Sequence, residues 1–221
     1  MERKNEFKRQ ISIVLGQKNQ LWWDLPASES LYLNKRIYGI GDEEYRQTLN
    51  ELCGLLQVEN LLDVPVRTLS LGERMKLELI AALLHKPKVL FLDEPTSGLD
   101  PTNNRLMKDI ILAEKKRGKT VIITTHNMFD ATELCDQVAF IVAGKVSALD
   151  SPHNLIMSRG AAKIQYTYYD KGEKTGECLL DRTTEDKLLK NLISENRLLS
   201  IHSSEPTLND IFVDITGRTL Q

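Results

Sequence analysis

Three short apolar runs divide the first part of the chain, and each is rich in the aliphatic and β-branched residues that favour strands. Gly16 directly follows the first run, which indicates that the chain enters a loop there. The three runs are Ile11 to Leu15, Val89 to Leu92 and Thr120 to His126. We expect a buried strand at each.

Between these runs, apolar residues recur every three or four positions, as on one face of a helix. Asp42 is placed to cap a first helix, whose apolar face carries Tyr45, Leu49, Leu52 and Leu56. A second helix opens in the segment Thr68 to Arg74 and carries on one side Met75, Leu79, Ala82 and Leu83. A third is expected over about Asn103 to Lys116.

The order strand, helix, strand predicts a parallel α/β sheet, whose ligand site lies beyond the carboxyl ends of its strands. After His126 the pattern predicts a further helix to about Cys135 and then a strand over Gln137 to Val142. These elements form a first domain over residues 1–155, with a helical subdomain at about 27–86.

The pattern changes near residue 161, where a hairpin signal replaces the alternation of strands and helices. A helix from Thr184 to about Glu195, a short strand near Leu199 to His202 and a last helix from Leu208 follow. We expect residues 156–221 to form a small α+β appendage of βαβ-like arrangement.

Composition narrows the functional classes. A formal net charge of −2, from 29 Lys+Arg against 31 Asp+Glu, lacks the basic excess of a nucleic-acid-binding protein. No apolar run approaches the roughly 18 residues that span a bilayer, so a membrane role would be peripheral. Three widely spaced cysteines favour reduced, packed thiols over a disulfide framework or a zinc site.

The segment Val89 to Asp100, V-L-F-L-D-E-P-T-S-G-L-D, carries the main candidate chemistry. A buried strand ending in two acids delivers carboxylates to the edge of the sheet. Hydrolysis of a phosphoanhydride needs a metal opposite the phosphates, a base for the water and donors for the γ-phosphate. Asp93 suits the metal, Glu94 suits the general base, and His126, at the end of the neighbouring strand, can reach the γ-phosphate.

With these residues in place, the chain resembles the ATP-binding subunits of ABC transporters across about Ile11 to Val146. L-S-L-G-E, Leu69 to Glu73, resembles the signature motif usually written L-S-G-G-Q. F-L-D-E-P-T-S-G-L-D resembles the Walker B strand and D-loop, and T-T-H-N the switch-histidine loop. Gln17 matches the Q-loop glutamine, and Gln20 fits that position less well because it does not directly follow the strand.

The resemblance implies an incomplete P-loop NTPase sheet, with ATP and Mg²⁺ as ligands. It implies that Ser70 and Gly72 present a hydroxyl and an amide to the γ-phosphate of ATP bound on the opposite subunit of a head-to-tail dimer. Asp100 would approach the other site of that dimer, while Asp93 and Gln17 would serve Mg²⁺. Two positions depart from the signature: Leu71 replaces a glycine, and Glu73 adds a negative charge where glutamine is usual.

The resemblance also implies partners and a location: a transmembrane permease subunit, a second ATPase subunit, and the cytoplasmic face of the membrane. The pair Trp22-Trp23 has two interpretations, core packing or a groove that receives the permease. The segment Glu205 to Phe212 resembles the carboxyl-terminal ending of exporter-type ABC ATPases. The permease sets substrate and direction, so neither follows from this sequence.

No G-x-x-x-x-G-K-[ST] loop occurs in these 221 residues, so the amide cradle and lysine that supply most phosphate binding are missing. We expect this polypeptide alone neither to bind ATP tightly nor to hydrolyse it. Three interpretations remain open: a shortened exporter ATPase, a non-hydrolysing protein that docks on a permease or complements a partner ATPase, and a non-transport ABC ATPase.

Overall fold

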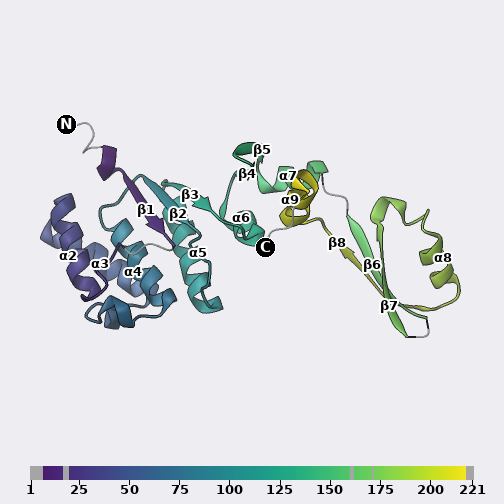
Figure 1. The fold of residues 1–221 in the computed structure, drawn as a ribbon, viewed down its shortest axis with the longest axis horizontal. Helices are drawn as coiled ribbons and strands as arrows, with labels where there is room; N and C mark the ends of the chain where they lie inside the picture. The colour runs from purple at the N-terminus through teal and green to yellow at the C-terminus, as the bar shows by residue number, and fades with distance from the viewer. Residues whose placement is uncertain (1–6, 17–19, 160–161, 171, 218–221) are drawn as a thin grey trace. The chain divides into compact units, whose positions relative to one another are not determined.

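The computed structural model describes residues 7–16, 20–159, 162–170 and 172–217. The chain divides into two compact units, residues 1–126 and 127–221 (Figure 1). The domain boundary expected after residue 155 falls inside the second unit. Each unit is described by itself.

The first unit is built on a parallel sheet. Its strands are β1 (Ile11–Leu15), β2 (Val89–Asp93) and β3 (Thr120–Thr124), in the order β1-β2-β3. Their registers align Leu15 with Asp93 and Asp93 with Thr124, so the three strands end level with one another. The parallel α/β fold class predicted from the sequence is confirmed.

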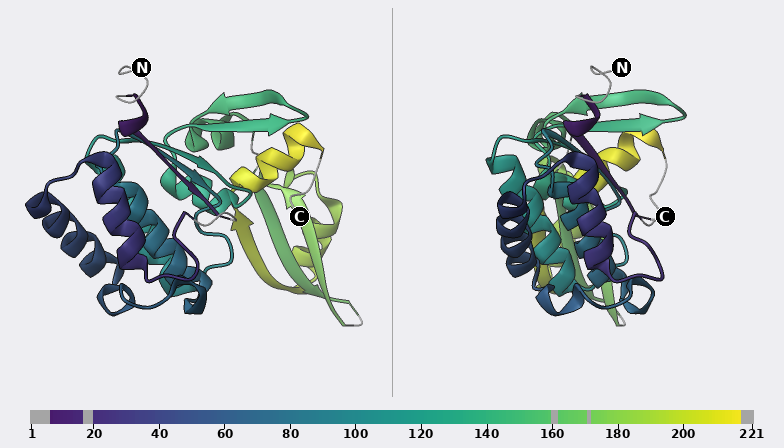
Figure 2. Two further views of the ribbon diagram at one scale, coloured as in Figure 1. Left: turned by 60° about the vertical axis from the view of Figure 1, so that its left-hand side comes forward. Right: turned by 90° about the vertical axis from the view of Figure 1, so that its left-hand side faces the viewer.

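Four helices pack together beside this sheet, two of them directly on it (Figures 1 and 2). Helix α4 packs on β1 and α5 packs on β3, while α2 and α3 pack on α4. The helices are α2 (Ala27–Tyr38), α3 (Asp42–Leu56), α4 (Leu71–Leu83) and α5 (Pro101–Lys116), with 3₁₀ turns η1 (Glu59–Leu61) and η2 (Val66–Thr68) between α3 and α4.

Three local predictions need correction. Gly41, not Asp42, is the N-cap of α3, and the Asp42 carboxylate instead pairs with Lys35. Helix α2 lies at the start of the helical subdomain expected over about 27–86, but the sequence prediction did not delimit it, because no side chain caps its start after Pro26. Helix α4 is buried on nearly all sides, at ten of its thirteen residues, rather than on one face, because it lies between the sheet and three other helices.

The two faces of the β1-β2-β3 sheet differ in burial. Val14, Leu90 and Leu92 are fully buried on one face. On the other, Ile13, Phe91 and Ile122 are aligned by register, and Ile13 and Ile122 are 46% and 44% exposed. We call these three residues the outer row. In the described part of the first unit, this apolar row has no covering layer.

The second unit contains two packed clusters. The first joins α6 (Met128–Leu134), the antiparallel hairpin β4 (Val138–Val142) and β5 (Lys145–Asp150), α7 (Pro152–Arg159) and α9 (Leu208–Thr216). Phe140 lies at its centre and meets the Phe212 ring edge-to-face, with centroids 5.3 Å apart. The sequence had predicted that the last helix would belong to the carboxyl-terminal appendage. Helix α9 instead packs with α6 and α7.

The second cluster is an antiparallel sheet in the order β7-β6-β8, covered by one helix. Its elements are β6 (Lys163–Tyr169), β7 (Glu173–Leu179), η3 (Leu180–Arg182), α8 (Lys187–Ser194) and β8 (Leu198–Ser204). Both β7 and β8 run antiparallel to β6, and are therefore parallel to each other. The expected βαβ arrangement is present in split form, with β6 inserted between the two parallel strands.

His85, just beyond α4, makes the stability of the first unit depend on pH. Its ring stacks on Tyr38 with centroids 3.8 Å apart, and its Nε2 lies 3.4 Å from the carbonyl oxygen of Ile11. Its Nδ1 is buried without a hydrogen-bond partner among the described residues. Burial lowers the pKa of His85 below its usual value of 6.5.

We therefore expect the free energy of unfolding to fall as the pH drops below about 6.5, because the unfolded chain takes up the His85 proton first. The contribution is complete above that pH and is lost progressively towards the lowered pKa. His85→Phe keeps a ring on Tyr38 but cannot titrate, so urea unfolding over this window should give a flatter profile. Equal slopes for both proteins would contradict this assignment.

Candidate functional site

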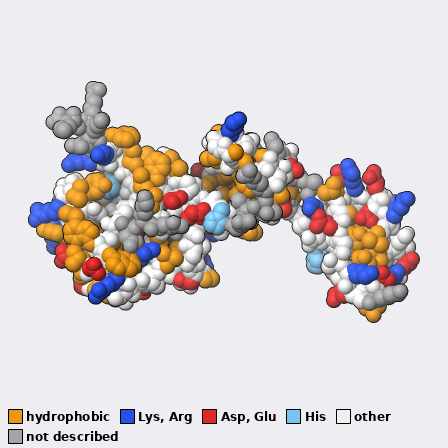
Figure 3. Space-filling view, in the orientation of Figure 1, with side chains coloured by type: hydrophobic (Ala, Val, Ile, Leu, Met, Phe, Trp, Pro, Cys, Tyr) orange, Lys and Arg blue, Asp and Glu red, His pale blue; other side chains and the backbone are white. Residues whose placement is uncertain are grey.

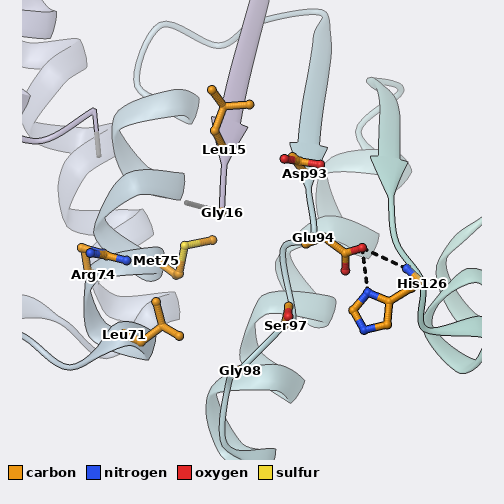
Figure 4. Close-up of a pocket in the computed structure, with 10 residues that line it drawn as sticks. All are labelled: Leu15, Gly16, Leu71, Arg74, Met75, Asp93, Glu94, Ser97, Gly98 and His126. Atoms are coloured by element: carbon orange, nitrogen blue, oxygen red, sulfur yellow. Dashed lines mark hydrogen bonds and ion pairs between the residues drawn. The ribbon is translucent and has the colours of Figure 1, made fainter. Parts of the chain in front are cut away.

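A pocket of about 910 Å³ opens where the parallel strands of the first unit end (Figure 4). Strand β1 and its following glycine form one wall, the start of α4 another, and the residues after β2 and β3 the rest. The lining residues are Leu15, Gly16, Leu71, Arg74, Met75, Asp93, Glu94, Ser97, Gly98 and His126. The structure thus brings Asp93, Glu94 and His126 to one site.

Glu94 is held in place by the end of the neighbouring strand. Its N–H donates to the Thr124 carbonyl at 2.9 Å, which extends the pairing of β2 with β3 by one residue. Its carboxylate Oε1 accepts from the backbone N–H of His126 at 3.0 Å and lies 2.8 Å from His126 Nδ1. The imidazole is thereby oriented, and its Nε2 makes no hydrogen bond within the described residues.

The backbone of Glu94 has a left-handed conformation, with φ of 48°. Such a conformation is costly for a residue with a Cβ and is found where surrounding structure enforces it, often at functional sites. Here the reversal directly after Asp93 turns the Glu94 side chain towards His126 (Figure 4). Backbone strain therefore accompanies the placement of the candidate base.

Asp93 ends β2, and the Thr124 hydroxyl donates to its carboxylate. Its carbonyl oxygen accepts from Gly16 N–H at 3.2 Å, and a Cβ at Gly16 would lie 3.0 Å from that oxygen. A single hard carboxylate suits Mg²⁺, which takes one or two carboxylates together with phosphate and water oxygens. The described residues hold no group of three His, Cys, Asp or Glu side chains that could bind a metal unaided.

The two candidate glutamines have different outcomes. Gln17 lies outside the described residues, so its predicted contacts remain a prediction. The Gln20 side-chain amide donates to the Ile13 carbonyl, back on β1, and Gln20 does not line the pocket.

The signature residues cap their own helix. Ser70 is the N-cap of α4 and forms a capping box with Glu73, whose Oε2 accepts from the Ser70 N–H and hydroxyl at 2.8 Å each. These bonds lower the pKa of Glu73, so its extra charge serves the helix start. Gly72 is buried, and a Cβ there would come within 2.6 Å of Asn103 Nδ2.

Asp100 has a similar local role at the start of α5. Its Oδ1 accepts from the N–H groups of Thr102 and Asn103, both at 3.0 Å, which lowers the pKa of Asp100. Neither Asp100, Ser70 nor Gly72 lines the pocket that contains Glu94. The predicted nucleotide-binding residues therefore lie in two groups.

Arg74 is a pocket residue that the sequence reasoning missed. It lies on α4 one turn beyond Ser70, and its guanidinium carbon is 6.0 Å from the centroid of the Trp23 ring. Trp22 and Trp23 are 50% and 47% exposed, which contradicts the core-packing interpretation of the pair. The helical spacing of Leu71, Arg74 and Met75 was the signal that could have located Arg74.

Comparisons with known proteins bear on the family and the fold of this chain. A family model described as "AAA domain, putative AbiEii toxin, Type IV TA system" matches residues 19–129, about half of the chain. A solved "Structure of ATP binding subunit of ABC transporter" shares the fold, with a TM-score of 0.65 at 24% identity over 71% of this chain and 65% of that one.

Curated relatives are export proteins. A fluoroquinolones export ATP-binding protein of Mycobacterium tuberculosis is 44% identical over 153 residues, which cover 68% of this chain and 51% of the relative. A Nod factor export ATP-binding protein I of Burkholderia orbicola is 32% identical over 227 residues, covering 96% and 75%. The chain thus spans about half the length of the first of these relatives. None of the described helices is long and apolar enough to cross a membrane.

Replacing Glu94 separates backbone strain from side-chain chemistry. Glu94→Gly and Glu94→Ala both remove the carboxylate, but only glycine adopts a positive φ without strain. We expect the glycine variant to have the larger free energy of unfolding in urea, by about 1 kcal/mol. An alanine variant of equal or greater stability would show that the reversal at Glu94 is not strained.

Proposed function

Because this chain belongs to the family of ATP-binding subunits of ABC transporters, of the export type, we propose that it forms the catalytic-base, signature and switch-histidine part of an ATP-hydrolysing export subunit. The single observation that carries the proposal is the Glu94–His126 pair beside Asp93, at the shared carboxyl ends of β2 and β3. A base, a ring donor and a metal-binding carboxylate meet there in one pocket.

Each residue has a role that follows from its position. The Glu94 carboxylate accepts the proton of the attacking water, while the His126 N–H groups keep it oriented. With Nδ1–H donating to Glu94, His126 Nε2 would donate to the γ-phosphate in the form of the ring that carries both protons. Bound Mg²⁺ would neutralise phosphate charge, with Asp93 holding it directly or through water, and Gln17 as its second protein partner.

We propose that this polypeptide alone binds ATP weakly and does not turn it over. Among the described residues, the pocket offers Arg74 as its guanidinium but also the two carboxylates of Asp93 and Glu94. Without a glycine-rich loop and its lysine, a triphosphate would meet more negative than positive charge. The exposed outer row supports a further polypeptide layer on the opposite face of the sheet, carrying that loop.

Two partners complete the proposal. Ser70, Gly72 and Asp100 lie outside the Glu94 pocket, which supports their serving ATP on a second ATPase subunit in a head-to-tail dimer. The exposed Trp22 and Trp23 support docking of a permease beside the Gln17 segment. Figure 3 shows hydrophobic side chains in patches over the visible face of the first unit. The protein would then act at the cytoplasmic face of a membrane.

Fragment complementation tests this function. The purified chain should show no ATP turnover with Mg²⁺. Adding a separate fragment of an ABC transporter ATP-binding subunit that carries a G-x-x-x-x-G-K-[ST] loop should produce turnover, and should slow hydrogen exchange along β1, β2 and β3. Glu94→Gln should abolish that turnover, because the amide cannot accept the water's proton.

Glu173→Gln, at an exposed position in the second unit, is the matched control and should leave complemented turnover unchanged. Turnover by the chain alone that Glu94→Gln abolishes would refute the proposed dependence on a missing loop. Complementation that restores exchange protection but gives turnover insensitive to Glu94→Gln would refute the assignment of the base.

A further inference from the structure

Glu78 is a buried carboxylate to which the sequence reasoning gave no role. It lies on α4, two turns beyond Ser70, and is only 2% exposed. A buried carboxylate is costly unless hydrogen bonds compensate for the lost water. We therefore asked which hydrogen bonds compensate for the burial of Glu78 in the middle of α4.

The bonds of Glu78 reach a distant part of the chain. Its Oε1 accepts from Gln20 N–H at 2.8 Å and from Leu21 N–H at 3.3 Å, across 58 and 57 residues of sequence. Its Oε2 is buried and has no hydrogen-bond partner among the described residues. Arg74, one turn earlier on α4, is the nearby positive charge, yet burial dominates and raises the pKa of Glu78.

The chain on the other side of residues 17–19 is also attached, but to a different element. Gly16 N–H donates to the Asp93 carbonyl at 3.2 Å, and the close approach leaves little room for a Cβ. One side is thus fixed to the end of β2, which carries Asp93 and Glu94. The other side is fixed, through Glu78, to the helix that begins with the signature.

The attachment continues beyond Leu21 into the exposed tryptophan pair. Trp22 N–H donates to Ser30 Oγ at 2.9 Å, and the Trp23 carbonyl accepts from Arg67 N–H at 3.0 Å. The backbone of residues 20–23 is therefore bonded to the helical elements, while the Gln20 side chain also contacts β1 through the Ile13 carbonyl. A shift of α4 relative to β2 would be transmitted through Glu78 to this segment.

We propose that Glu78 is a positioning residue that ties the chain just beyond Gln17, and the Trp22-Trp23 surface after it, to the signature helix. The hydrogen-bond acceptor, rather than the bulk of the side chain, carries this role. A role of Glu78 in coupling nucleotide binding to the permease rests on the proposed function. The positioning of residues 20 and 21 by Glu78 does not.

Three variants of Glu78 distinguish the effects of its hydrogen-bond acceptor, its size and its side-chain length. Glu78→Gln keeps the size and one acceptor oxygen but removes the charge. Glu78→Leu keeps the bulk and removes the acceptor. Glu78→Asp keeps the charge but shortens the side chain by one methylene, which draws the acceptor away from Gln20 and Leu21. Hydrogen exchange of Gln20 and Leu21 should accelerate about tenfold in the Leu and Asp variants, the loss expected when a buried N–H donor loses its acceptor. The Gln variant should stay close to wild type.

Acrylamide quenching gives a second readout, because Trp22 and Trp23 are the two tryptophans of the chain. Quenching should rise in the Leu and Asp variants and be restored by Gln, while exchange within α4 stays protected. In the complemented enzyme, the Leu variant should lower kcat with KM for ATP little changed, and Gln should rescue it.

Unchanged exchange protection of the Gln20 N–H in the Leu or Asp variant would contradict the proposal that Glu78 positions this segment. Equal loss of protection in the Gln variant would overturn the acceptor role. If the Leu variant fails to fold, the Asp variant decides, because it retains the buried charge and most of the volume. Exchange and quenching need no turnover, so a failed complementation assay would count against the proposed function and leave this inference standing.

Discussion

The packing of the first unit depends on the burial of helix α4. The helix lies between β1 and the helices α2, α3 and α5, so it has almost no solvent-facing side on which to place polar groups. A buried polar group on this helix is therefore costly unless a hydrogen bond compensates for the lost water. Ser70 and Glu73 satisfy the helix start, and Glu78 takes two backbone donors from the loop after β1. The same helix thus provides apolar side chains for the core and a hydrogen-bond acceptor for the loop after β1.

The strands and their terminal acids were predictable because both are local properties of the sequence. A short aliphatic run followed by Asp93 and Glu94 indicates a strand with carboxylates at its end, whatever surrounds it. The position of His126 followed from the parallel order, since equivalent strand ends lie at one edge. The left-handed backbone of Glu94 was not predictable, because tertiary contacts impose it against the residue's own preference.

Other features depended on partners far away in sequence. The sequence predicted a last helix from Leu208, but not that Leu208 and Ile211 would meet Met128 and Phe140. Glu78 reads in the sequence as an ordinary helix-forming residue, and its role appears only when Gln20 and Leu21 are placed beside it. Periodicity specifies which side of an element is buried and leaves the identity of the neighbour open.

The exposed outer row affects both the self-association and the stability of the folded chain. Ile13, Phe91 and Ile122 form an apolar band on an open sheet face, a surface that attracts chaperones and favours self-association when left bare. A layer that binds this band stabilises the folded chain by mass action, in proportion to its free concentration. Under the proposed function, the free energy of unfolding of this chain would rise with the effective concentration of the segment that covers the outer row.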